Sequence, residues 1–180
     1  HQSLIATKAN RIVRAAQGKA IAEFGSRRAH GAEAAILGAR AAYIGGCVGT
    51  ACAIADREYN VPSLGTMAHS WVQMFDSEYE AFCEYAKLYP DNCSFVIDTY
   101  DTLKSGVPNA IKAFEYLRDN GLDTSHIGIR IDSGDLAYLS KQARKMMDKA
   151  GFPQSKIVLS NGLNAETIES LISQGAKFDL

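Results

Sequence analysis

The sequence predicts an α/β fold in which parallel strands alternate with helices. Along residues 94–173, short apolar runs that end at polar residues are separated by segments with a helical period. Parallel strands require long crossovers, which are usually helices. Two architectures fit, a doubly wound sheet and a (β/α)8 barrel. Because a complete barrel takes about 250 residues, this chain of 180 residues would hold only part of one.

Composition and charge narrow the function classes. The formal net charge is -1, which gives no general attraction to nucleic acid or to an anionic membrane. A hydrophobic share of 47% with 22% charged residues is typical of a globular protein. No apolar run has the length of a membrane span, no signal peptide opens the chain, and the four cysteines form no CxxC pair. We therefore expect a reduced, cytoplasmic setting.

The ends of the chain indicate a piece of a longer protein. Residue 1 is His rather than Met, and residues 175–180 resemble the opening of another strand. We expect residues 1–180 to be one fragment of a barrel domain whose N-terminal and C-terminal flanks are absent.

The expected elements of the first third are short. They are a strand at 19–24, a helix at 32–40, a strand at 41–45 and a helix at 50–59. Residues 61–66 make a poor strand because Pro62 cannot donate to a ladder.

The later elements are clearer. The helix at 108–120 has Pro108 in its first turn and Gly121 past its end, the usual asymmetry of helix termini. Gly151 would end another helix, and Asn164 would cap the last one. Helices are expected at 77–88, 108–120, 136–150 and 165–173, and strands at 94–97, 127–131 and 156–159.

Several of the expected strands end in a polar cluster. The segments are 23–30, 65–70, 98–102, 130–135 and 160–162. Ligands bind at the C-terminal ends of strands in barrels and in open α/β sheets alike. The pattern therefore predicts an enzyme or a small-ligand site.

The residue types at these ends suit a phosphorylated sugar together with a second anion. Arg27, Arg28 and Arg130 offer forked donors for phosphate or carboxylate. The backbone amides of 133–134 and 161–162 suit anions. The acids that could hold sugar hydroxyls or Mg²⁺ are Asp98, Asp101, Asp132 and Asp135, and the metal ligands among them stay unassigned.

Each candidate also has a simpler structural interpretation. Arg27 and Arg28 could pair with Glu23 and Glu33 on the surface. Asp132 and Asp135 could cap a helix, and Asp98 and Asp101 could belong to an ordinary turn. His69 could be a buried, hydrogen-bonded histidine, and Trp71 and Phe75 are most simply core residues.

Four segments together resemble the nicotinate phosphoribosyltransferase family. They are Glu23-Phe24-Gly25-Ser26-Arg27-Arg28-Ala29-His30-Gly31, Gly65-Thr66-Met67-Ala68-His69-Ser70-Trp71, Asp98-Thr99-Tyr100-Asp101-Thr102 and Ile129-Arg130-Ile131-Asp132-Ser133-Gly134-Asp135. The resemblance covers essentially the whole chain. It implies part of an irregular (β/α) barrel and an enzyme that joins nicotinate to phosphoribosyl pyrophosphate, forming nicotinate mononucleotide for NAD salvage with coupled ATP hydrolysis.

The resemblance also implies roles for individual residues. His69 matches the histidine that ATP phosphorylates, and Asp98 matches a carboxylate near the ribose. The substrate contacts would be Thr66, Arg130, Asp132, Ser133, Arg27, Glu23 and Asn161. Mg²⁺ and ATP are the implied cofactor and co-substrate, and a homodimer is the implied assembly.

Three other interpretations remain open. Glu23 could accept a hydrogen bond from an amide, so a nicotinamide-specific enzyme is one alternative. The family's glycine-rich 5′-phosphate loop has no counterpart in residues 1–180, so a non-catalytic regulatory barrel module is another. A different barrel enzyme acting on sugar phosphates would use similar strand ends but would not explain the surroundings of His69.

Overall fold

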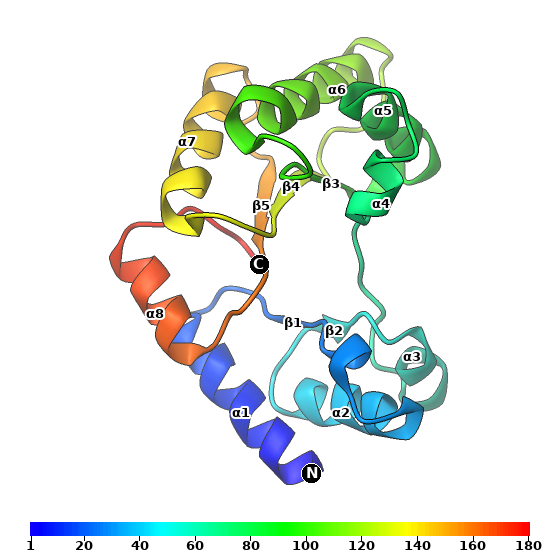
Figure 1. The fold of residues 1–180 in the computed structure, drawn as a ribbon, viewed down its shortest axis with the longest axis vertical. Coiled ribbons are helices and arrows are strands. Elements are labelled where there is room, and N and C mark those ends of the chain that lie inside the picture. Colours follow the sequence, from blue (N-terminus) through cyan, green and yellow to red (C-terminus); the bar gives the residue numbers. More distant parts are fainter. The chain divides into compact units, whose positions relative to one another are not determined.

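The computed structural model describes the backbone of residues 1–180 and every side chain except that of Asp91. The chain forms two compact units. The first unit comprises His1–Gly65, Leu163–Ile172 and Leu180, and the second comprises Thr66–Gly162 and Ser173–Asp179. Each unit contains parallel strands with helices packed against them (Figure 1).

The first unit is mainly helical. Strands β1 (Ala22–Glu23) and β2 (Gly49–Thr50) form a parallel pair in which Ala22 lies opposite Gly49. The helices are α1 (Gln2–Ala15), α2 (Ala32–Ile44), α3 (Ala53–Tyr59) and most of α8 (Ala165–Ser173), with a 3-10 turn, η1 (Ser26–Arg28). Ala15, Ala16 and Ile168 form a buried cluster that packs α8 against the end of α1.

The strand expected at 41–45 is wrong, because these residues complete helix α2. The amide of Gly45 donates to the carbonyl of Ala41 at 3.0 Å, a helical spacing. A short apolar run does not distinguish a strand from a buried helix turn, and the alanines that precede this run favour helix. The close approach of α1 explains Gly45, because a Cβ there would lie 2.7 Å from the carbonyl oxygen of Ala6.

The neighbouring elements are shorter than expected. The strand predicted at 19–24 is reduced to Ala22–Glu23. The helix predicted at 50–59 begins at Ala53, because Thr50 belongs to β2. Residues 61–66 contribute a single bridge between Ser63 and Thr50, which agrees with their poor strand propensity.

The second unit contains three parallel strands in sequential order. They are β3 (Cys93–Val96), β4 (Ile127–Ile131) and β5 (Lys156–Leu159). Phe95 lies opposite Ile129, and Ile129 lies opposite Ile157. The helices are α4 (His69–Val72), α5 (Glu78–Leu88), α6 (Val107–Asp119) and α7 (Leu136–Lys149), with a 3-10 turn η2 (Pro90–Asn92) and a π-helical turn η3 (Thr102–Gly106). In Figure 1, α5, α6 and α7 flank the three strands.

A column of aromatic rings fills the core of the second unit. Phe95 of β3 stacks between Phe82 and Phe114, at centroid distances of 4.7 and 5.3 Å. Phe114 meets Phe152 edge-on at 5.5 Å. These four rings are almost completely buried, so each contributes a large hydrophobic stabilisation and joins α5 and α6 to β3.

Side-chain caps start several helices where the sequence predicts them. Asp135 accepts the amide of Tyr138 at 2.9 Å, and Asp101 accepts the amide of Lys104 at 2.9 Å. Asn164 accepts the amide of Thr167 at 2.8 Å, which confirms its predicted cap. Asp135 therefore acts as a cap, which is its simpler interpretation, whereas Asp101 caps the π-helical turn η3 instead of belonging to an ordinary turn.

The end of the chain does not form the expected strand. Residues 176–180 have no strand assignment, although the amide of Asp179 donates to the carbonyl of Ile157 in β5 at 2.8 Å. Among the described residues, no helix has both the length and the apolar character that a membrane crossing requires.

Candidate functional site

The carboxyl ends of β4 and β5 meet at Arg130. Its Nε donates to Ser160 Oγ at 2.8 Å, and a terminal nitrogen donates to Asp132 Oδ1, also at 2.8 Å. The other terminal nitrogen donates to Thr66 Oγ1 at 3.1 Å. The Arg130 side chain is 16% exposed, so the guanidinium is held in one orientation at the rim of the site.

His69, the first residue of α4, contacts the ends of β3 and β4. Its Nδ1 lies 3.2 Å from Thr99 Oγ1, and its Nε2 lies 3.4 Å from Asp132 Oδ2. A second carboxylate oxygen, Asp98 Oδ1, lies 4.0 Å from Nε2. Two acids on the Nε2 side favour a proton on Nε2, which leaves Nδ1 to accept from the hydroxyl of Thr99. The imidazole remains 39% exposed, so a ligand can reach it.

Asp98 ties the end of β3 to the start of the loop after β4. Its Oδ2 accepts the backbone N–H of Asp132 at 3.0 Å and the hydroxyl of Ser133 at 2.5 Å. Its Oδ1 is buried and has no hydrogen-bond partner among the described residues. A buried carboxylate oxygen without a donor is costly, so Asp98 offers a negative charge to a cationic group in the site.

The electrostatic balance at Asp132 favours its charged form. Burial alone would raise the pKa of this carboxyl, but the hydrogen bonds from Ser160 and Arg130 and the positive charge of Arg130 outweigh burial. The net effect is a pKa below the ordinary value of 3.8. Asp132 therefore remains ionised beside His69 at neutral pH.

The second unit gathers most of the sequence-predicted site residues. Thr66, His69, Asp98, Arg130, Asp132 and Ser133 belong to one connected hydrogen-bond network. Asn161 follows Ser160 in this unit, is exposed and has a left-handed backbone with φ of 78°.

Sequence reasoning did not select Thr99 and Ser160, although both bind predicted site residues. Ser160 Oγ donates to Asp132 Oδ1 at 2.5 Å and accepts from Arg130. Ser160 directly follows β5, and Thr99 lies three residues after the end of β3. This position is a weak signal, because hydroxyl residues are common after strands.

Glu23, Arg27 and Arg28 belong to the first unit and form a separate group there. Glu23 Oε1 accepts the amide of Gly25 at 2.5 Å, and Oε2 accepts the hydroxyl of Thr50 at 2.6 Å. Arg27 is exposed. Glu23 therefore shapes the turn that carries the two arginines.

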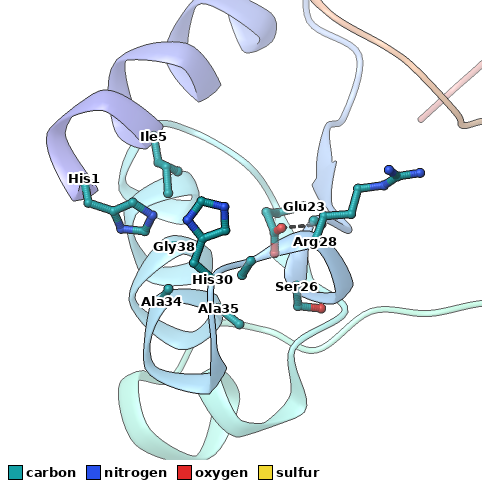
Figure 2. A pocket seen from close by; sticks show the side chains of 11 residues that line it. His1, Ile5, Glu23, Ser26, Arg28, His30, Ala34, Ala35 and Gly38 are labelled. Atoms are coloured by element: carbon teal, nitrogen blue, oxygen red, sulfur yellow. Dashed lines mark hydrogen bonds between the residues drawn. The ribbon is translucent and has the colours of Figure 1, made fainter.

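A pocket of about 330 Å³ lies beside this turn (Figure 2). Glu23, Ser26, Arg28 and His30 contribute to its wall, and helix α2 supplies the small residues Ala34, Ala35 and Gly38. Figure 2 shows the guanidinium of Arg28 pointing away from the rings of His1 and His30. The pocket therefore presents a mixed wall rather than a concentrated positive charge.

The part of the chain that the structure describes contains no preformed metal site made by side chains alone. Among the described residues, no group of three or more His, Cys, Asp or Glu side chains has the arrangement that could hold a metal ion. The four cysteines are buried free thiols. A bound Mg²⁺ would therefore have to take most of its ligands from substrate phosphates and water, which is its usual preference in nucleotide sites.

Comparison with known proteins gives consistent matches. The model of the nicotinate phosphoribosyltransferase (NAPRTase) family matches residues 19–178. The chain is 50% identical over 180 residues to nicotinate phosphoribosyltransferase of Bacillus subtilis, covering all of this chain and 36% of that protein. It is 45% identical over 178 residues to a nicotinate phosphoribosyltransferase of Mycobacterium tuberculosis, covering 99% of this chain and 37% of that protein.

Solved structures agree on the fold. Human nicotinic acid phosphoribosyltransferase superposes with a TM-score of 0.89 at 25% identity, covering 99% of this chain and 46% of that chain. A nicotinate-nucleotide pyrophosphorylase from Pyrococcus furiosus gives 0.80 at 26% identity, covering 98% and 48%. The chain spans little more than a third of the length of the two bacterial relatives. With a family model that matches 19–178 and a relative that shares half of its residues, this chain belongs to the nicotinate phosphoribosyltransferase family.

Proposed function

We propose that the whole protein transfers a phosphoribosyl group from phosphoribosyl pyrophosphate to nicotinate and so supplies nicotinate mononucleotide for NAD salvage. The observation that carries this proposal is the network that joins Arg130, Asp132 and His69 at the strand ends of a chain of this family. A phosphoribosyl donor needs cations for its leaving group and anions for its ribosyl carbon, and the network offers both charges.

The transfer makes defined demands on the site. The bond between ribose C1 and pyrophosphate oxygen breaks, and its electron pair leaves with pyrophosphate. The ring nitrogen of nicotinate supplies the pair for the new C1–N bond. Positive charge develops on the ribose in between, and the buried carboxylate of Asp98 would stabilise it.

Arg130 would hold the second anion. A guanidinium matches a carboxylate by two parallel hydrogen bonds, which an ammonium cannot do. The hydroxyl of Thr66, which accepts a hydrogen bond from Arg130, would contact the same anion. Ser133 and Asn161 would contact the sugar or the phosphate. Arg27 is proposed as a further cation of the substrate site.

Nicotinate is favoured over nicotinamide by the bonds that Glu23 already makes. Both carboxylate oxygens of Glu23 accept hydrogen bonds within the chain. An amide substrate would therefore share each Glu23 oxygen with a donor of the chain, whereas the neighbouring Arg27 and Arg28 offer cations that suit a carboxylate substrate. Glu23 is thus proposed to support the substrate site through the turn that it binds.

His69 is proposed as the phosphorylated residue that couples ATP hydrolysis to transfer. The Nδ1 lone pair would give up its hydrogen bond from the Thr99 hydroxyl and attack the γ-phosphorus of ATP. The bond between that phosphorus and the oxygen that bridges it to the β-phosphate would break, and ADP would leave with the electron pair. Water would later cleave the phosphohistidine and release phosphate. Asp132 would hold the Nε2 proton during both steps.

Mg²⁺ is proposed as the cofactor. The orphaned, buried Oδ1 of Asp98 fits a hard cation, and Asp132 is a second charged oxygen donor nearby. When bound, Mg²⁺ would neutralise the pyrophosphate that leaves.

The larger architecture is also a proposal. The sequential parallel order β3-β4-β5, with a helix between successive strands, supports an arc of an irregular (β/α) barrel. Residues 1–180 would form a fragment of that barrel domain, in a cytoplasmic homodimer. A non-catalytic regulatory module is the alternative function. An assay for nicotinate mononucleotide formation distinguishes it from the enzyme.

The test uses the full-length protein. Nicotinate mononucleotide and pyrophosphate should form in equal amounts from nicotinate and phosphoribosyl pyrophosphate, and ATP should increase the rate. Calorimetric titration should show tighter binding of nicotinate than of nicotinamide. Preference for the amide would overturn the substrate assignment, and absence of any product would favour the regulatory module.

A further inference from the structure

A buried acid lies outside the site, at the start of helix α5. Glu78 is 4% exposed. Its Oε2 accepts the hydroxyl of Ser105 and the amide of Asn109, the latter at 3.3 Å. Asn109 also donates to Ser105 Oγ at 3.3 Å, so the three side chains form a closed group. Glu78 thus links α5 to the turn η3 and to α6.

Burial of the Glu78 carboxylate lowers the stability of the fold, although it links three helical segments. Glu78 Oε1 is buried and has no hydrogen-bond partner among the described residues. The backbone amides of the first turn of α5 offset part of that cost, but an uncharged residue would pack there at less expense. A buried group that reduces stability calls for a role other than packing.

The turn that Glu78 holds adjoins the end of β3. The amides of Ser105 and Gly106 both donate to the carbonyl of Asp101. Gly106 lies so close to the strand that a Cβ would be 1.8 Å from the carbonyl oxygen of Ile97. The position of η3 therefore determines where residues 97–101 run, and these residues include Asp98 and Thr99.

The same helix holds the segment that carries His69. Trp71 of α4 donates its indole N–H to the carbonyl of Ala81 in α5 at 2.9 Å. The ring of Trp71 also meets that of Tyr85 of α5 edge-on at 6.1 Å. Helix α5 consequently contacts both the helix of His69 and, through Glu78, the turn that follows Thr99.

We propose that Glu78 is a positioning residue that sets the separation between the His69 imidazole and the Asp98–Thr99 end of β3. The proposal rests on the proposed function, because it concerns the geometry of the same site. Glu78 anchors η3 through Ser105 and Asn109, and α5 anchors α4 through Trp71. Loss of Glu78 lets η3 move, which lengthens the 3.2 Å contact between His69 and Thr99.

Three variants of the full-length protein separate positioning from folding. Glu78→Ala removes the acceptor. Glu78→Gln keeps an oxygen that accepts from Ser105 and removes the charge. Glu80→Gln is the matched control, because Glu80 is an exposed acid on the same helix. Ser105→Ala removes the donor and leaves Glu78 in place, which provides a second route if Glu78→Ala does not fold.

The readouts are the turnover and KM for nicotinate, the rate of His69 phosphorylation by ATP, and the ¹⁵N signals of the His69 imidazole. Misplacing a reacting group by about 1 Å costs up to about a hundredfold in rate. We expect Glu78→Ala to lower phosphorylation and turnover about tenfold, within that range, while KM for nicotinate stays within about twofold because Arg130 is held from β4 and β5. Glu78→Gln should keep most of the wild-type phosphorylation rate and turnover, and Glu80→Gln should have the wild-type values.

The outcomes are distinguishable. Unchanged His69 signals and unchanged turnover in folded Glu78→Ala, or in Ser105→Ala where Glu78→Ala does not fold, would overturn the positioning role. A loss of activity that only parallels the fraction of unfolded protein would overturn it as well. If wild-type protein is never phosphorylated, the phosphohistidine proposal fails by itself, and the His69 signals of Glu78→Ala still decide whether Glu78 positions the imidazole.

Discussion

The carboxylate of Asp98 accepts the backbone N–H of Asp132 at 3.0 Å, which locks the end of β3 to the residue that comes after β4. The same carboxylate presents its other oxygen to His69 at 4.0 Å. One acid therefore serves two purposes, alignment of neighbouring strand ends and a charge in the site. Substitution of Asp98 would change the strand alignment and the charge of the site together. Variants of the residues around Asp98 separate these two effects better.

His69→Ala should abolish stimulation by ATP and retain part of the basal transfer. The imidazole is the nucleophile proposed to receive phosphate, whereas the Arg130 contacts to Thr66 and Ser160 do not involve it. Rates with and without ATP measure the effect. His126→Ala is the control, because His126 is exposed and lies just before β4. ATP stimulation that survives in His69→Ala removes His69 from the coupling.

Arg130→Lys should weaken nicotinate binding by about ten- to a hundredfold, the range expected when a desolvated charge-assisted hydrogen bond is lost. An ammonium cannot reproduce the three directions that the guanidinium uses toward Ser160, Thr66 and Asp132. KM for nicotinate reports the change. Arg57→Lys, at a side chain that is 75% exposed, is the control. Equal affinities in Arg130→Lys and wild type would contradict the assignment.

The free energy of unfolding should fall at acid pH in part because Asp132 becomes protonated. The folded pKa of this carboxyl lies below its ordinary value of 3.8. A depressed folded pKa gives stability that is present above the unfolded value and is lost as the pH falls from there through the folded value. Urea unfolding between pH 5 and about pH 2 should therefore show a shallower acid decline for Asp132→Asn than for wild type. Parallel declines would be inconsistent with the ion pair, and Asp119→Asn, at a side chain that is 67% exposed, is the matched control.

Two cysteines should resist alkylation in the native protein. Burial raises the pKa of Cys93 to about 12, and burial together with the charge of Glu23 raises that of Cys47 to about 11. At pH 8, the thiolate of Cys93 would be about one part in ten thousand. Iodoacetamide labelling followed by peptide mapping should show both residues unmodified until denaturant is added. Rapid labelling of either thiol without denaturant would contradict their burial.

Gly106→Ala should destabilise the protein by about 3 kcal/mol or more, at the upper end of overpacking effects. The new methyl group would overlap the carbonyl of Ile97, which belongs to backbone that cannot move without disturbing Asp98. Chemical denaturation measures the free energy of unfolding. Gly121→Ala tests a different case, because Gly121 has open space but a φ of 70°, so its cost should be smaller and due to backbone strain.

The second unit could be predicted well because its signals are local. Strands 127–131 and 156–159 are β-branched runs that stop at polar residues, and Pro108 and Gly121 mark the ends of α6. The site residues Asp98 and Arg130 were predicted from their place at strand ends, since parallel strands bring those ends together. Helix α4 was not predicted, because four residues provide too little periodicity.

The missed features depend on contacts that spacing does not encode. Thr99 and Ser160 matter because of which atoms they meet, and a hydroxyl after a strand is too common to identify alone. Residues 41–45 were assigned to a strand because a short apolar run is ambiguous. The structure shows which of the predicted site residues lie together, whereas the catalytic and substrate-binding roles of all of them stay predictions. The acids Asp101 and Asp135 cap helical segments.

The π-helical turn at Thr102–Gly106 leads directly into α6. The number of residues in this turn therefore sets which face of α6 is directed toward the strands. Each residue added to or removed from a helical segment rotates the rest of the helix by about 100°. A deletion within this turn would swing Val107, Ala110 and Phe114 away from the strands that now bury them. The side chains of the turn can therefore be exchanged more readily than its length, which is constrained by the core beneath it.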